Sequence, residues 1–206
     1  MQNAKPETPR KTRIQQRNAE AILDAALQVF SDHGFRGATL DQIAKQAGLS
    51  KPNLLYYFKS KDAIHAELLA GLMDTWLDPL RAMNEDDDPK SQLLAYMKRK
   101  LEMSRTLPRE SRLFANEILQ GAPRIGAGLS GDLKDLVDEK ATLIKDWSAA
   151  GHIADVDPYH LIFSIWALTQ HYADFEVQVR SVLDQADPYP DAQVFLETLF
   201  DKLLAP

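Results

Sequence analysis

Residues 39–61 contain the sequence feature that most restricts how this chain can fold. Thr39 is a good helix N-cap, and apolar residues then recur at helical spacing up to Gly48, where a left-handed residue commonly follows a helix. Ser50 can cap a second short helix, which carries Pro52 in its first turn. Two short helices joined by a turn that contains glycine predict a helix-turn-helix.

The second short helix carries side chains suited to DNA. We expect its buried side at Leu54 and Phe58, which lie four residues apart. Its other side presents Lys, Asn and Tyr side chains, which can reach phosphates and base edges in a major groove. The spacing alone leaves an ordinary helical hairpin as the alternative.

A wider pattern surrounds this motif. It comprises Gly34-Phe35, Thr39, Ile43-Ala44, Ala47-Gly48-Leu49-Ser50, Tyr56-Tyr57-Phe58 and Lys61. The pattern covers residues 1–65 and resembles the DNA-binding domain of the TetR family of repressors. The recognition helix of that family usually carries Tyr where this chain has Leu55. The DNA-contacting residues that we expect are Arg36, Thr39, Lys51, Pro52, Asn53, Tyr56, Tyr57 and Lys61.

Charge is distributed unevenly along the chain. Residues 1–61 hold ten Lys/Arg and five Asp/Glu, a net of +5, whereas residues 62–206 hold fourteen and twenty-five, a net of −11. A basic module on an acidic body suits a protein that contacts DNA at one end. Residues 1–16 are basic and lack apolar periodicity, so we expect a flexible arm. This arm either contacts DNA phosphates or a minor groove, or is a solvated tail.

The remainder of the chain is predicted to be helical, because strand-like alternation is not evident. Beyond the motif, the expected helices cover residues 61–83, 90–106, 108–120, 129–150, 158–180 and 191–204. The chain is therefore predicted to be all-α with about nine helices. We expect a helix-turn-helix domain at residues 17–61 and a ligand-binding and dimerisation domain at residues 62–206.

Several classes of protein are disfavoured by composition. The 206 residues include no Cys, so disulfides and Cys-based metal sites are excluded. The N-terminus has no apolar signal segment and no apolar run is long enough to span a membrane, which predicts a cytoplasmic protein without a membrane partner. The five His residues lack metal-ligand spacing, and no phosphate loop or nucleophile elbow occurs. We therefore expect no metal, no cofactor and no catalytic residues; an enzyme that uses Glu117 and His171 as acid and base is the minor alternative.

Polar residues occur within an otherwise apolar segment at residues 163–175. Trp166, Gln170 and Ala173 share one helical stripe there. A buried amide needs a partner, and aromatic walls with a few directional polar groups describe a small-molecule pocket. A Gln side chain is donor and acceptor side by side, as is a cyclic amide. Aromatic residues at this spacing are also typical of an ordinary core.

Residues 74–79, 111–123 and 158–175 resemble the ligand domain of the Rut-type pyrimidine-utilisation repressors within the TetR family. The resemblance implies a uracil or thymine effector and control of pyrimidine catabolism genes. The ligand-contacting residues that it implies are Trp76, Phe114, Glu117, Gln170, His171 and Tyr172. In this interpretation Gln170 recognises the amide edge of the ring and an aromatic side chain stacks on it. The alternative is a TetR-type repressor that responds to an apolar drug or an acyl ligand.

The same family resemblance implies a homodimer. TetR-family members pair through their last two long helices, which correspond here to residues 158–180 and 191–204. A two-fold dimer places two recognition helices about 34–36 Å apart, which is one turn of B-DNA. We therefore expect a palindromic double-stranded operator as partner. A small-molecule effector would then change the tilt of helix 61–83 through Trp76 and so change the fit to DNA.

Overall fold

The computed structural model describes residues 13–206, and every regular element in that range is helical. The all-α prediction is therefore confirmed. The chain divides into two compact units, the first ending at Leu68 and the second running from Leu69 to Pro206. We expected the domain boundary between residues 61 and 62, at the start of the helix Lys61–Arg81. The observed division after Leu68 lies within that same helix. Residues 1–12 of the expected arm lie outside the described part, and residues 13–16 are already helical.

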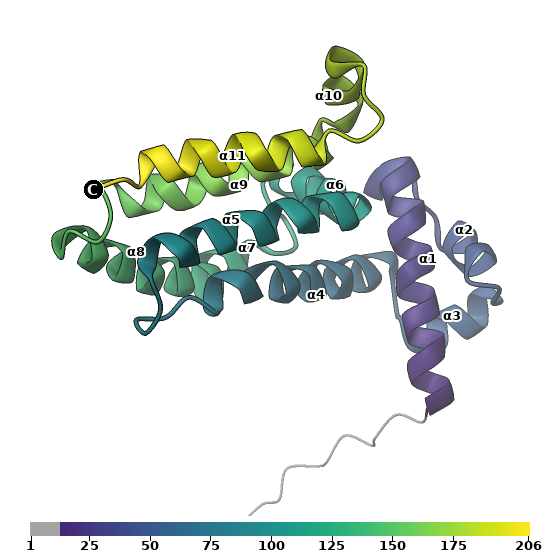
Figure 1. Ribbon diagram of the computed structural model, residues 1–206. Coiled ribbons are helices and arrows are strands. Elements are labelled where there is room, and N and C mark those ends of the chain that lie inside the picture. The colour runs from purple at the N-terminus through teal and green to yellow at the C-terminus, as the bar shows by residue number, and fades with distance from the viewer. Residues whose placement is uncertain (1–12) are drawn as a thin grey trace, which may run out of the picture. The chain divides into compact units, whose positions relative to one another are not determined.

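The first unit contains the predicted helix-turn-helix (Figure 1). Its elements are α1 (Arg13–Gly37), α2 (Leu40–Gln46), α3 (Lys51–Tyr57) and the start of α4 (Lys61–Arg81). Thr39 and Gln42 form a capping box at the start of α2, and Ser50 caps α3. Gly48 has φ +67° in the turn between them, a left-handed conformation that other residues rarely adopt. The two capped helices and the glycine turn therefore form the helix-turn-helix that the sequence predicts.

A small apolar core holds the three helices of the first unit together. Ile22 and Phe30 of α1, Ile43 of α2 and Leu54 of α3 are almost completely buried. Ile64, at the start of α4, is fully buried as well. The expected buried side of the second motif helix is therefore confirmed at Leu54.

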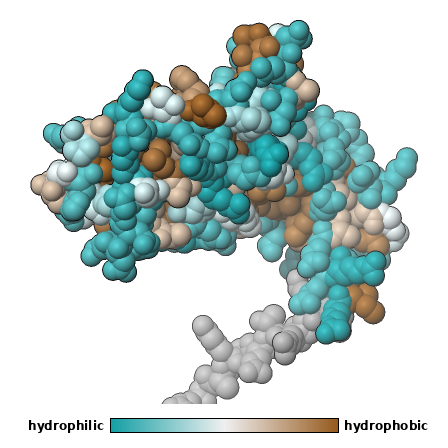
Figure 2. All heavy atoms as spheres, in the orientation of Figure 1, coloured by the Kyte–Doolittle hydropathy of each residue, from teal (hydrophilic) through white to brown (hydrophobic). Residues whose placement is uncertain are grey.

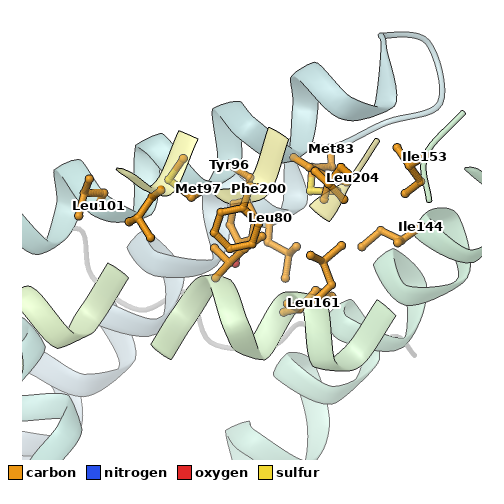
Figure 3. Packing of buried hydrophobic residues seen from close by; sticks show 14 of the residues in the cluster. Leu80, Met83, Tyr96, Met97, Leu101, Ile144, Ile153, Leu161, Phe200 and Leu204 are labelled. Atoms are coloured by element: carbon orange, nitrogen blue, oxygen red, sulfur yellow. The ribbon is translucent and has the colours of Figure 1, made fainter. Parts of the chain in front are cut away.

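The second unit is built around α5, which packs against α9 and α11. Its elements are the rest of α4, α5 (Pro89–Thr106), α6 (Pro108–Leu119), α7 (Gly126–Gly128), the π-helical turn η1 (Leu129–Leu133), α8 (Lys134–Ala149), α9 (Pro158–Asp174), α10 (Glu176–Leu183) and α11 (Tyr189–Leu203). Met97 of α5, Leu161 of α9 and Phe200 of α11 belong to one buried cluster (Figure 3). This core fixes the helices that surround the candidate pocket.

Two expected helices differ from the structure. The segment 158–180 is divided at Phe175, which has non-helical angles between α9 and α10. Ser111 Oγ donates to Asp174 Oδ1 over 2.6 Å, and Arg112 pairs with Glu176, so contacts with α6 hold the chain on both sides of this break. The expected helix 129–150 starts as the irregular turn η1, because Gly131 is non-helical.

Candidate DNA interface and effector pocket

The N-terminal half of α3 is open to solvent. Lys51, Pro52 and Asn53 are exposed, and Tyr56 is 70% exposed, although a Tyr side chain normally buries much of its ring. Lys51 pairs with Asp41 over 2.9 Å at the surface. Such an exposed pair is weak and can be exchanged for a DNA phosphate. The polar side of α3 is therefore accessible to solvent, as a recognition helix requires in order to contact DNA.

The two tyrosines of α3 are positioned by α1. Gln15 Nε2 donates to the Tyr56 hydroxyl over 3.2 Å, and Asn18 Nδ2 donates to the Tyr57 hydroxyl over 2.9 Å. The two rings meet edge to face with centroids 5.1 Å apart. The sequence did not indicate Gln15 and Asn18, because nothing in the spacing of α1 reveals which helix its polar side chains will contact.

The flanking residues of the motif have different environments. Arg36 and Thr39 are exposed, and the Thr39 hydroxyl takes part in the capping box. Lys61 is half-buried, and its Nζ donates to the carbonyls of Phe35 and Ala38 over 2.7 Å each. The same ammonium lies 4.5 Å from the centroid of the Phe35 ring. We therefore expect Lys61 to hold α4 to the α1–α2 loop rather than to contact DNA.

The second unit contains a small cavity of about 60 Å³. One water molecule needs roughly 10–15 Å³ by the same measure, so this cavity accommodates a few waters or one small ring. Residues of five elements, α4, α5, α6, η1 and α9, form its wall. They are Met73, Trp76, Leu77, Lys100, Phe114, Leu133, Trp166 and Gln170.

Aromatic rings make up much of the cavity wall. Trp76 and Phe114 meet edge to face with centroids 4.9 Å apart. Trp166 donates from its Nε1 to the Tyr96 hydroxyl over 2.6 Å, which fixes the indole ring and uses its only polar atom. The indole therefore offers the cavity no hydrogen-bonding group.

Two polar groups reach the cavity. Gln170 is half-buried, and within residues 13–206 no side-chain partner is present for its amide. Lys100 is only 5% exposed, and its Nζ lies 5.2 Å from the centroid of the Trp76 ring. Burial lowers the pKa of Lys100 to about 8, opposed in part by the charge of Asp174. The cavity is thus apolar and aromatic with one amide and one ammonium.

Three of the expected ligand residues do not line this cavity. Glu117 is buried, and its carboxylate accepts from the backbone N and the Nη1 of Arg124 over 2.7 and 2.9 Å. His171 is exposed and stacks on Phe175, because one residue after Gln170 the helix has turned by about 100°. Tyr172 packs against the main core, where burial raises the pKa of its hydroxyl. Only Trp76, Phe114 and Gln170 of the expected set come together.

A wider groove adjoins the cavity on the surface of the second unit. It has a volume of about 560 Å³ and shares Phe114, Leu133, Trp166 and Gln170 with the cavity. Its remaining wall is largely apolar and includes Ile118, Leu119, Leu129 and Phe175. The groove therefore meets the cavity at these four shared residues.

The helices at the C-terminal end of the second unit carry apolar side chains on their outer faces. On α11, Ala192, Leu196 and Phe200 face the core, whereas Val194, Phe195, Leu199 and Leu203 remain exposed. On α9, the exposed stripe at four-residue spacing is Tyr159, Phe163, Ala167 and His171, and exposed Phe175 continues it just beyond the end of the helix. Figure 2 shows further apolar surface over α10, where Val177 and Val182 are exposed. We call these exposed side chains of α9–α11 the apolar face.

A helix-turn-helix unit joined to an all-helical unit with an internal cavity defines a one-component transcriptional regulator. Two family models match the chain: "Bacterial regulatory proteins, tetR family" at residues 22–68 and "YcdC-like protein, C-terminal region" at residues 69–204. Their border coincides with the division between the two units. The chain belongs to the TetR family of transcriptional regulators.

Individual relatives agree with this assignment. The chain is 50% identical to the HTH-type transcriptional regulator RutR of Escherichia coli K12 over 88% of its length and 85% of that protein. It is 36% identical to the regulator IcaR of Staphylococcus aureus, over 32% of the chain and 36% of that protein. A solved structure of the putative regulator SCO4942 from Streptomyces coelicolor covers 91% of this chain and 98% of its own, with TM-score 0.69 at 24% identity.

These relatives are regulators, so the chain is not assigned to an enzyme class. The minor alternative of acid–base catalysis by Glu117 and His171 is therefore dropped. Within residues 13–206, no helix has the length and apolar character needed to cross a membrane.

Proposed function

We propose that this protein is a homodimeric repressor that binds operator DNA and is released by a pyrimidine base such as uracil or thymine. The observation that carries the proposal is the cavity with three aromatic rings and the amide of Gln170, which has no hydrogen-bond partner within residues 13–206. A flat ring that presents a donor beside an acceptor satisfies that amide while contacting the aromatic walls. The genes under control are then those of pyrimidine catabolism, as the resemblance of the ligand domain implies.

The size of the cavity favours a small ring over a long chain. A cavity of about 60 Å³ with two polar groups offers little room for an acyl tail. The adjoining groove supports the alternative effector, because its wide apolar wall could accept a drug or an acyl group. The two effectors therefore differ in which of the two spaces they fill.

The dimer in this proposal forms through the apolar face. Helix α11 has apolar side chains on two sides, and within residues 13–206 only the side of Leu196 and Phe200 is covered by other parts of the chain. Exposed apolar surface of this extent usually marks a protein–protein contact. A two-fold pair would bury the face against its own copy and supply the second recognition helix for a palindromic operator.

Coupling between ligand and DNA would pass through α4. The helix carries Trp76 in the cavity wall, and Lys61 and His65 at its other end contact the residues around the α1–α2 loop. A ligand that prefers one position of Trp76 thereby favours one placement of α4 and of the motif attached to it. Such a shift can only be as large as the difference in affinity of the ligand for the two arrangements.

A ligand panel tests the effector. Uracil or thymine at about a hundred times its Kd is expected to raise the melting temperature by roughly 5–10 °C, because ligand at that ratio stabilises the folded state by about 2.7 kcal/mol. The Gln170→Ala variant should lose at least tenfold in affinity measured by calorimetry, since the amide contact is removed. Gln46→Ala serves as the control, because it makes the same change at an exposed glutamine of α2 outside the cavity and the apolar face, and its ligand affinity should match that of the unsubstituted protein.

The same panel should include medium-chain acyl compounds. If these raise the melting temperature and the nucleobases do not, the effector is apolar and the adjoining groove becomes the binding site. Equal affinity of uracil for Gln170→Ala and the unsubstituted protein would contradict the role given to the amide.

A further inference from the structure

Two side-chain hydrogen bonds join α1 to the end of α3. Asn18 Nδ2 donates to the Tyr57 hydroxyl over 2.9 Å, and Gln15 Nε2 donates to the Tyr56 hydroxyl over 3.2 Å. Gln15 and Asn18 lie three residues apart and therefore face the same side of α1. Polar side chains of α1 thus determine where the two hydroxyl groups of α3 lie.

The packing of the first unit does not require the bond between Asn18 and Tyr57. Leu54 already fixes α3 to the core without any exposed surface, and Ile22, four residues after Asn18, is equally buried. Asn18 and Tyr57 are only half-buried, so water could satisfy both polar groups in place of their bond. Asn is also a weak helix former within a helix such as α1. The position of Asn18 is therefore better explained by its effect on Tyr57 than by the stability of the fold.

The direction of this hydrogen bond leaves Tyr57 with a hydrogen to donate. An amide N–H only donates, so the Tyr57 oxygen is the acceptor. Within residues 13–206 the Tyr57 hydroxyl donates to no other group, and the same holds for Tyr56. A hydroxyl that accepts one hydrogen bond is polarised and donates the next one more strongly. The missing partner of Tyr57 must therefore be an acceptor.

A DNA phosphate is such an acceptor, because its oxygens accept hydrogen bonds from tyrosine hydroxyls. The ring of Tyr56, which meets that of Tyr57 with centroids 5.1 Å apart, is 70% exposed, so the end of α3 is accessible to a duplex. We infer that Asn18 is a positioning residue of the DNA interface, which holds the Tyr57 hydroxyl so that its hydrogen points to a phosphate of the operator. This inference rests on the operator binding in the proposed function and is independent of the effector.

The geometry determines the sign of the effect that loss of Asn18 should have. Without the Asn18 amide, the Tyr57 hydroxyl rotates freely and bonds to water, so part of the operator affinity is lost. In the opposite arrangement, the hydroxyl would donate to the Asn18 carbonyl. Removal of that carbonyl would then release the hydroxyl and strengthen DNA binding. The two arrangements therefore predict opposite changes in the Kd for operator.

The test is a double-mutant cycle on operator binding without effector, measured by fluorescence anisotropy of the full-length protein at several salt concentrations. The operator is a duplex that the unsubstituted protein has selected from random sequences. Asn18→Ala is expected to raise the Kd about 5–30-fold, because each of the two half-sites of the dimer loses about two- to fivefold. Tyr57→Phe should raise it at least about tenfold, and Asn18→Ala should add less than about twofold in the Tyr57→Phe background. Because neither side chain is charged, log Kd should keep the same slope against log salt in every variant.

Gln28→Ala is the matched control, because it removes another amide of α1, one that donates to Asp32 of the same helix. Its operator affinity should equal that of the unsubstituted protein. An unchanged or lower Kd for Asn18→Ala, or an equal loss in the Tyr57→Phe background, would overturn the inference while operator binding itself stands. A flatter salt dependence of Asn18→Ala would overturn it as well, since charged contacts would then have been lost. If the unsubstituted protein selects no duplex, the proposed function fails and the inference fails with it.

Discussion

Replacing Phe195 by glutamate is expected to produce a folded monomer whose operator affinity is at least a hundredfold lower. Phe195 is 58% exposed on α11, so the change leaves the core of the protein unaffected. In a two-fold dimer each copy places the new carboxylate against the apolar face of its partner, and both charges lose water without gaining a counter-charge. Loss of the dimer removes the second recognition helix, and simultaneous binding of two sites typically contributes a factor of about 10²–10⁴.

Light scattering and fluorescence anisotropy with operator DNA measure these two effects. Thr142→Glu is the control, since it introduces the same carboxylate at an exposed residue of α8 that lies outside both the apolar face and the groove. The control should remain dimeric and bind operator normally. A Phe195→Glu protein that is dimeric at micromolar concentration would show that the apolar face is not the dimer interface.

Lys100→Met is expected to stabilise the ligand-free protein by about 1–3 kcal/mol and to raise its melting temperature by about 3–8 °C. Burial shifts the pKa of Lys100 from 10.5 to about 8. At about 1.36 kcal/mol per pKa unit, keeping the side chain charged in the folded protein at pH 7 costs at most about 3 kcal/mol. Methionine fills a similar volume without charge but gives up the contact of the ammonium with the Trp76 ring.

The pH dependence of this stabilisation has a defined sign. Between about pH 8 and 10.5 the unfolded chain holds the Lys100 proton and the folded chain releases it, so the stability of the unsubstituted protein rises with pH through that window. The advantage of Lys100→Met is therefore largest below pH 8 and decreases toward pH 10.5. Calorimetric melting at pH 7 and pH 9.5 measures it, with Lys98→Met as the control, because it removes an ammonium from the same helix at a solvent-exposed ion pair with Glu197. A Lys100→Met protein less stable than the original at pH 7 would mean that the ammonium has a structural role.

The helix-turn-helix could be predicted because its signals are local. Thr39 and Ser50 cap helices through their own neighbours, and Gly48 adopts the left-handed angle that its position requires. The break at Phe175 could not be predicted, because the segment has no glycine or proline there and is held by contacts with Ser111 and Arg112. Such tertiary contacts cannot be recognised from the helical periodicity of the sequence.

Residues of the pocket could be predicted from the sequence only where a polar or aromatic side chain stands out within an apolar helix. Trp76 and Gln170 are conspicuous in apolar helices, and both line the cavity. Lys100 gave no such signal, because a lysine among apolar helix residues usually extends its charge into solvent. Its burial becomes clear only when α4 and α9 are placed around α5. Glu117 was misleading for a similar reason, since its partner Arg124 lies in the following loop.

Ligand in the pocket and DNA on the recognition helices are expected to oppose each other's binding. The most direct measurement is the affinity of the dimer for an operator duplex, selected by the protein from random sequences, as uracil is added. We expect the Kd for DNA to rise about a hundredfold, which corresponds to about 2.7 kcal/mol of preferential ligand binding to the DNA-free form. The rise should begin near the Kd of uracil for the DNA-free form and level off only at concentrations above roughly a hundred times that value. An operator affinity that stays constant while uracil saturates the pocket would contradict the account.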